Sequence, residues 1–139
     1  MKLSARNQFA GTVTKVVEGA VNGIVTIDVN GTPVSATISM SAIRELCLEP
    51  GRKAYAVIKA TDVMVGLGEH LTLSARNQLP GRIIGIEKGV VNSIVRMKAL
   101  GGNTISATIS NMAVEELKLA PGVDALAVIK ATSVMVGVD

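Results

Sequence analysis

Hydrogen-bond donors are concentrated in one short block near the start of the chain. Ser4-Ala5-Arg6-Asn7 offers a hydroxyl, a guanidinium, a side-chain amide and successive backbone N–H groups. Lys59 adds an ammonium group, and Ser39 adds a hydroxyl at a possible helix N-terminus, where unpaired N–H groups favour an anion. A dianion that carries no proton near neutral pH needs donors and no neighbouring carboxylate. These residues therefore predict a site for a fully deprotonated tetrahedral oxyanion, whereas hydrogen phosphate would lack an acceptor for its proton.

The same residues also have a purely structural interpretation. A Ser-x-Arg-Asn segment alone is more often a capped turn with a surface arginine, and Lys59 alone is more often a solvated strand end. Both features recur, however, because Ser74-Ala75-Arg76-Asn77 repeats the block, and Ser110 and Lys130 repeat Ser39 and Lys59. Residues 12–15 have meanwhile diverged from residues 82–85. Matched donors beside diverged sequence favour a binding role.

Other site chemistries lack the residues they need. The single His70 and the single Cys47 cannot supply a zinc tetrad or a Cys/His nucleophilic pair. Glu45 and Glu116 are more simply solvated helix carboxylates than a general acid and base. We therefore expect no catalytic residues, no metal held directly by protein ligands, and no enzyme activity.

Internal repetition organises the whole chain of 139 residues. Residues 3–8 read Leu-Ser-Ala-Arg-Asn-Gln and return at 73–78, a shift of 70. Residues 35–39 and 57–61 return at 106–110 and 128–132, a shift of 71, so one residue was inserted between about positions 29 and 35. The chain is therefore a tandem duplication.

Each copy has the pattern of a small barrel. Residues 24–29 alternate apolar and polar side chains, and Asn30-Gly31 follows as a hairpin turn. In the first copy, strands are predicted over residues 9–17, 24–29, 34–38, 53–58 and 63–65, and a helix capped by Ser39 or Ser41 over residues 39–46. We expect an all-β fold with one short helix per repeat: two tandem five-stranded barrels of the oligonucleotide/oligosaccharide-binding (OB) type. Their predicted bounds are residues 1–67 and 71–139, with a linker at 68–70.

The composition predicts an obligate oligomer. Hydrophobic residues make up 48% of the chain but aromatic residues only 1%, so the core must consist of aliphatic side chains and methionine. Each copy of roughly 70 residues is marginal in size for an independent stable domain. Cys47 is the single cysteine, and Lys118 stands at the corresponding position of the second copy, so an intrachain disulfide is excluded. We therefore expect apolar surface to be buried between the copies and between chains.

Charge and targeting features are weak. The formal net charge of +3 is dispersed, with no basic run typical of a nucleic-acid arm or a membrane-surface patch. The first residues contain no apolar signal-peptide core. We expect a soluble, cytoplasmic protein without a nucleic-acid or membrane partner.

Four motifs in order resemble a known family. S-A-R-N near the start, G-A-V-N after the first strand, then V-I-K-A-T and V-M-V-G closely resemble the molbindins, whose unit is the Mop domain. The resemblance covers nearly the whole chain twice. It implies two Mop domains, a homotrimer, and binding of molybdate or tungstate as a ligand for molybdenum storage or homeostasis, with the anions at interfaces between Mop units.

The resemblance implies two kinds of oxyanion site. The first uses the Ser and Arg of one unit, the Lys of a neighbour and a further Ser; its residues here are Ser4, Ala5, Arg6, Asn7, Ser39 and Lys59, and Ser74, Ala75, Arg76, Asn77, Ser110 and Lys130. Ala42 and Ala113 stand where related regulators carry another Ser, so a contribution from Ser41 or Asn111 stays open. The second kind uses two turns: Gly19, Ala20, Val21 and Asn22, and Gly89, Val90, Val91 and Asn92.

Alternative functions are a nucleic-acid-binding OB module or a structural oligomerisation module. Nucleic-acid binding of this type needs stacking aromatic side chains and a basic groove. Phe9 and Tyr55 are the only aromatic residues, and neither recurs in the other copy. No helix-turn-helix pattern precedes Leu3, which argues against a DNA-binding regulator.

Overall fold

The computed structural model describes residues 1–139, and it contains two five-stranded antiparallel sheets. The first repeat contains β1 (Asn7–Val17), β2 (Asn22–Val29), β3 (Thr32–Ser39), α1 (Met40–Glu45), β4 (Lys53–Ile58), the 3-10 turn η1 (Ala60–Asp62) and β5 (Met64–Gly66). The second contains β6 (Asn77–Lys88), β7 (Asn92–Ala99), β8 (Asn103–Ser110), α2 (Asn111–Glu116), β9 (Asp124–Ile129), η2 (Ala131–Ser133) and β10 (Met135–Gly137). Every predicted strand and helix is present, and the predicted fold class is confirmed. No helix has the length and apolar character needed to cross a membrane.

Local sequence explains the strands and turns. Val25, Ile27 and Val29 are fully buried (0% exposed), as their alternation predicts, because successive side chains of a strand point to opposite faces. The hairpin between β2 and β3 turns at Asn30 and Gly31, whose φ angles are 51° and 91°. Asn and Gly tolerate this left-handed region, which two-residue hairpins require. The inserted residue falls in the matching turn of the second repeat.

Each short helix begins at a capping serine. The Ser39 side chain accepts a hydrogen bond from the Ala42 backbone N–H at 3.1 Å, and Ser110 does the same for Ala113 at 3.1 Å. Such a cap satisfies a backbone donor that the first helical turn leaves without a partner. Of the two predicted caps of α1, Ser39 is therefore the one used.

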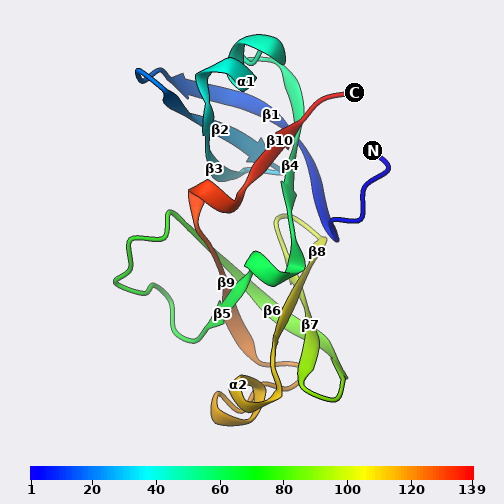
Figure 1. Cartoon of the computed structure of the whole chain (residues 1–139). Coiled ribbons are helices and arrows are strands. Elements are labelled where there is room, and N and C mark those ends of the chain that lie inside the picture. The colour runs from blue at the N-terminus through cyan, green and yellow to red at the C-terminus, as the bar shows by residue number, and fades with distance from the viewer.

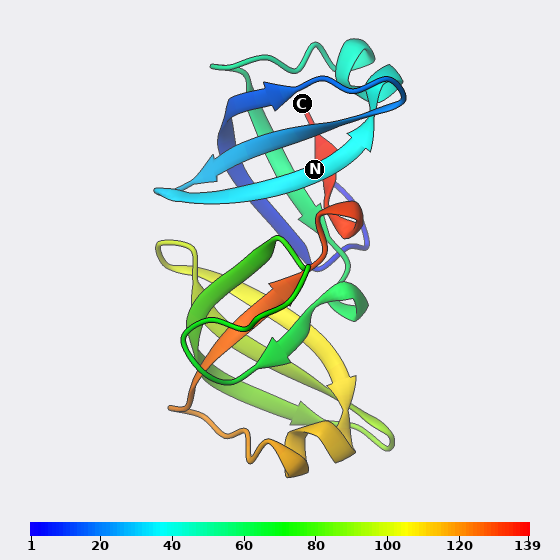
Figure 2. The ribbon, with the colours of Figure 1, turned by 90° about the vertical axis from the view of Figure 1, so that its left-hand side faces the viewer.

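The two repeats exchange their last strands. The strand order is β10-β4-β1-β2-β3 in one sheet and β5-β9-β6-β7-β8 in the other. The sequence predicts residues 63–65 in the barrel of their own copy, but this prediction is wrong, because Met64–Gly66 pairs with β9 and Met135–Gly137 pairs with β4. Figures 1 and 2 show β10 crossing into the half of the molecule that holds α1, and β5 lying in the half that holds α2. The alternation pattern identifies a strand but not its partner, and β4 and β9 end in the same V-I sequence.

A single core runs through both repeats. One cluster of 27 buried residues includes Val25 and Ile27 of the first repeat and Val95 and Met97 of the second. Phe9 is its one aromatic member and is 3% exposed. The expected burial between the copies is therefore confirmed, and it follows from the strand exchange, since each sheet carries apolar side chains of both repeats.

Candidate functional site

A cavity of about 360 Å³ gathers much of the predicted first-repeat site. Ser4, Ala5, Arg6 and Lys59 all line it, together with Met135 of the exchanged strand β10. No carboxylate lines this cavity. The sequence-predicted donors are thus brought together within one chain, at the ends of two strands.

Strand register explains why Arg6 and Lys59 meet. β1 begins at Asn7 and pairs antiparallel with β4, with Asn7 opposite Ile58. The residue before Asn7 and the residue after Ile58 therefore leave the sheet side by side. Both cationic side chains are exposed, and neither forms an ion pair within the chain. Their charge is therefore available to an anionic ligand.

The second repeat has the same register with a different surface. Asn77 lies opposite Ile129, so Arg76 and Lys130 leave the sheet side by side as well. Ser74, Arg76 and Lys130 are exposed, but the structure has no cavity lined by them. Within a single chain, the two copies of the predicted site are therefore not equivalent.

The two asparagines of the repeated blocks join the repeats. The Asn7 side chain donates to the Ser106 carbonyl at 2.9 Å and accepts from the Ser106 N–H at 2.8 Å. Asn77 makes the matching pair with Ser35, at 2.9 Å and 2.8 Å. Because β3 and β8 are the last strands of their sheets, these backbone groups of Ser35 and Ser106 have no neighbouring strand to pair with. The asparagine amides bond them instead. Their side chains therefore have a structural partner inside the chain, which the sequence did not reveal.

Ser39 and Ser110 lie apart from this cavity. Helices α1 and α2 occupy opposite ends of the molecule, whereas β4 and β9 end near its middle (Figures 1 and 2). The serines that cap these helices are exposed and do not line the cavity with Arg6. A single chain does not bring the two parts of the first predicted site together.

The two predicted turn sites also lie beside the helices. The Met40 N–H donates to the Val21 carbonyl at 2.8 Å, and the Asn111 N–H donates to the Val91 carbonyl at 2.9 Å. Val21, Val90 and Val91 are 74%, 99% and 70% exposed. Both turns therefore project from the ends of the molecule with their apolar side chains in solvent.

Asn111 has a defined role in the second turn. Its amide nitrogen donates to the carbonyls of Gly89 and Val90 at 3.0 Å and 3.2 Å, and its oxygen accepts from the Ser93 hydroxyl. The first repeat carries Met40 and Gly23 at these positions, so it lacks the same bonds. Asn111 is thus committed to the turn, while the Ser41 side chain is exposed.

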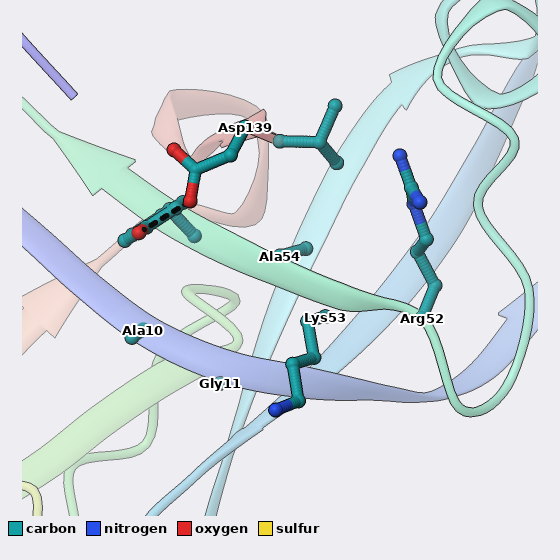
Figure 3. A pocket seen from close by; sticks show the side chains of 8 residues that line it. Ala10, Gly11, Arg52, Lys53, Ala54 and Asp139 are labelled. Atoms are coloured by element: carbon teal, nitrogen blue, oxygen red, sulfur yellow. Dashed lines mark hydrogen bonds between the residues drawn. The ribbon is translucent and has the colours of Figure 1, made fainter.

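A further cavity of about 240 Å³ was not anticipated from the sequence. Arg52, Lys53, Tyr55 and Asp139 line it (Figure 3). The Tyr55 hydroxyl donates to the Asp139 carboxylate at 2.9 Å, and this hydrogen bond together with the carboxylate charge raises the pKa of Tyr55. Arg52, Lys53 and Tyr55 correspond to Val123, Asp124 and Leu126 in the second repeat, and Asp139 corresponds to Gly68 in the first, so no repeat signal marks these residues. The carboxylate makes this cavity a poor match for a dianion.

The aromatic residues do not form a stacking surface. Phe9 is buried in the core, and Tyr55 is held by Asp139. Stacking of bases needs exposed aromatic faces along a groove. The arrangement therefore offers no platform of the kind that a nucleic-acid-binding OB module uses.

Comparison with known proteins gives consistent matches. The chain matches the TOBE domain twice, over residues 3–65 and 73–136. It is 40% identical over 141 residues to the molybdenum transport protein ModE of Herbaspirillum seropedicae, covering 100% of this chain and 52% of that protein. It is 46% identical over 66 residues to molybdenum-pterin-binding protein 1 of Clostridium pasteurianum, covering 48% of this chain and 97% of that protein.

A solved structure matches over its full length. The cytoplasmic molybdate-binding protein ModG, with molybdate bound, superposes with a TM-score of 0.96 at 42% identity, covering 100% of both chains. By contrast, the chain spans about half the length of the ModE proteins that it matches, 52% of each. The similarity to ModG therefore extends over both repeats.

Proposed function

The chain belongs to the TOBE-domain family, with one such domain in each repeat, and we propose from this that it is a non-catalytic molybdate-binding protein of the cytoplasm. Its ligand is molybdate or the similar dianion tungstate, and its role is molybdenum storage or homeostasis. The ModG structure, which holds molybdate, supports binding of the anion itself.

The observation that carries this proposal is the cavity beside Arg6 and Lys59. Two cations and the Ser4 hydroxyl line it without a carboxylate, which matches a tetrahedral dianion that accepts hydrogen bonds and donates none. Two positive charges balance the two negative charges of the ligand. Neither cation is engaged by an acidic side chain, so binding costs no internal ion pair.

We further propose that the site is completed in a homotrimer. The rim of the cavity carries exposed apolar side chains, since Leu3 is 56% and Met135 is 45% exposed. A neighbouring chain that covered them would exclude water and strengthen the attraction between the cations and the anion. In this arrangement Ser39 or Ser110 of a neighbour supplies the missing hydroxyl, and the exposed turns at residues 19–22 and 89–92 form the second kind of site.

The units of this function are the two repeats, residues 1–67 and 71–139, joined at 68–70. Because their last strands are exchanged, we propose that the repeats act as one rigid pair and not as two independent modules. The linker is tied down at one end, where the Gln78 side chain bonds both the N–H and the carbonyl of Leu71 at 2.7 Å and 2.8 Å.

Calorimetric titration with molybdate, tungstate, sulfate and phosphate tests the proposal, with mass measured in parallel by light scattering. We expect molybdate and tungstate to bind a trimer, and Lys59→Ala to weaken this binding by ~2–5 kcal/mol, the usual cost of removing one partner of a buried charge pair. Lys15→Ala is the matched control, since Lys15 is an exposed lysine of β1 outside the cavity. Absence of binding by every oxyanion would overturn the function, and unchanged affinity of Lys59→Ala would overturn the site.

A further inference from the structure

A smaller cavity of about 70 Å³ lies where the first repeat meets the second. Arg6 and Ala60 line it from the first repeat, and Arg96, Ser106 and Thr108 line it from the second. Arg6 thus lines two cavities, the larger one with Lys59 and this one with Arg96. Arg96 is not among the oxyanion-site residues that the resemblance to the molbindins implies.

Strand pairing places the polar side chains on one face. β7 and β8 pair antiparallel with Ile94 opposite Thr108 and Arg96 opposite Ser106. Residues two apart on a strand point to the same side, so these four side chains form one continuous patch. The patch faces away from the core, because the intervening Val95 and Ala107 are both 0% exposed.

The position of Arg6 over this patch is fixed through its neighbour. Asn7 is 0% exposed and bonds both backbone groups of Ser106. The turn η1, which contains Ala60, also packs against β8. The backbone at Arg6 is therefore fixed next to the β7–β8 face by contacts that involve no ligand, and the Arg6 side chain lines the cavity there.

We propose that this cavity is an additional oxyanion-binding site, formed by one chain alone. Two guanidinium groups and the hydroxyls of Ser106 and Thr108 line it, and no carboxylate does. These groups can donate to a small tetrahedral dianion from opposite sides, and arginine is the side chain best suited to paired contacts with such oxygens.

An acidic residue holds Arg96 without blocking it. Glu87 accepts a hydrogen bond from Nη2 of Arg96 at 2.9 Å, and the two side chains are 64% and 42% exposed. Glu87 does not line the cavity. The bond leaves Nε and Nη1 of Arg96 free to donate to an anion, and it restricts the rotamers of a long flexible side chain.

The first repeat provides an internal comparison. At the positions of Arg96 and Glu87 it carries Thr26 and Val17, whereas Ile24, Ser35 and Thr37 match the rest of the patch. No cavity is found beside Arg76 at that junction. Each chain therefore has one such site and not two, and Arg96 is the residue that makes the difference.

The additional site rests on the proposed function for its ligand, and it shares Arg6 with the larger cavity but has a different second cation. Arg6 lines both cavities, Lys59 lines only the larger one, and Arg96 lines only the smaller one. Removing Lys59 or Arg96 therefore affects one site at a time, while removing Arg6 weakens both.

Crystals of the full chain soaked in tungstate test the proposal, because tungsten is located directly by anomalous scattering. We expect a tungsten peak between Arg6 and Arg96 in the unaltered protein, and its loss in Arg96→Thr. Lys98→Thr is the matched control, since Lys98 is an exposed cation of the same strand outside the cavity, and it should keep the peak. Titration in solution should show one site fewer per chain for Arg96→Thr, and Thr26→Arg should add one.

The outcomes separate the two proposals. Tungsten beside Lys59 with none beside Arg96 would overturn the additional site and leave the proposed function standing. Tungsten at neither position would overturn both. A peak beside Arg96 that persists in Arg96→Thr would show that this arginine does not form the site.

Discussion

Replacement of Asn7 by alanine tests how the two repeats are held together. The Asn7 side chain is fully buried and bonds the N–H and the carbonyl of Ser106, 99 positions away, at 2.8 Å and 2.9 Å. Alanine removes both partners at once and adds no new group. The two Ser106 backbone groups then face a small void at the edge of β8.

The magnitude follows from these two groups. A buried donor or acceptor left without a partner costs about 1–3 kcal/mol, and Ser106 is only half-buried, so the pair should cost ~2–4 kcal/mol of unfolding free energy. For a chain of this size that corresponds to a fall in Tm of roughly 8–16 °C, at about 4 °C per kcal/mol. Asn77→Ala should cost about the same, because its bonds to Ser35 have the same geometry.

Thermal and urea unfolding at one fixed protein concentration measure the effect, since oligomerisation makes apparent stability concentration-dependent. Gln8→Ala is the control, because the strongest bond of Gln8 is a local one to the Ala5 carbonyl at 3.0 Å. Its loss should cost ~1 kcal/mol or less. If Asn7→Ala proved no more destabilising than Gln8→Ala, the reasoning that these amides join the repeats would be refuted.

Two further predictions concern packing and pH. A Cβ on Gly11 would overlap the Asp28 carbonyl oxygen, so Gly11→Ala should lower the unfolding free energy by ~1–3 kcal/mol. Gly85 has no atom near its Cβ position, so Gly85→Ala should be neutral or should stabilise the protein by ~0.4–1 kcal/mol. Urea unfolding of both variants measures these changes, and equal effects would contradict the prediction. Tyr55 is the only tyrosine, and Asp139 raises its pKa, so its absorbance change on ionisation should occur above the usual pH near ~10 and move down in Asp139→Asn. Because the pKa of Tyr55 is higher in the folded than in the unfolded state, its contribution to stability is present below the unfolded pKa and is lost as pH rises through the folded pKa. An unchanged titration of Tyr55 in Asp139→Asn would show that the hydrogen bond is absent in solution.

Much of the candidate site was readable from the sequence because it depends on local order. Ser4, Arg6 and Lys59 were identified by donor chemistry and recurrence, and they do share one cavity. The roles of Asn7 and Arg96 were not readable, because each depends on a contact between repeats that no local pattern encodes. From its position in the repeated block, Asn7 has the same predicted function as its neighbours, although its side chain bonds Ser106.

The sequence by itself determined the duplication, the strands and the capped helices. Alternation, Asn-Gly turns and capping serines act through neighbours along the chain, so their physical effect is visible in the order of residues. Only the tertiary structure decided which strand completes which sheet. Met64–Gly66 and Met135–Gly137 carry the same M-V-G sequence, and β4 and β9 offer similar edges, so local preference is nearly the same for either pairing. The choice is made by the chain path through η1 and η2, which pack against β8 and β3 of the opposite repeat and direct each following strand across the junction.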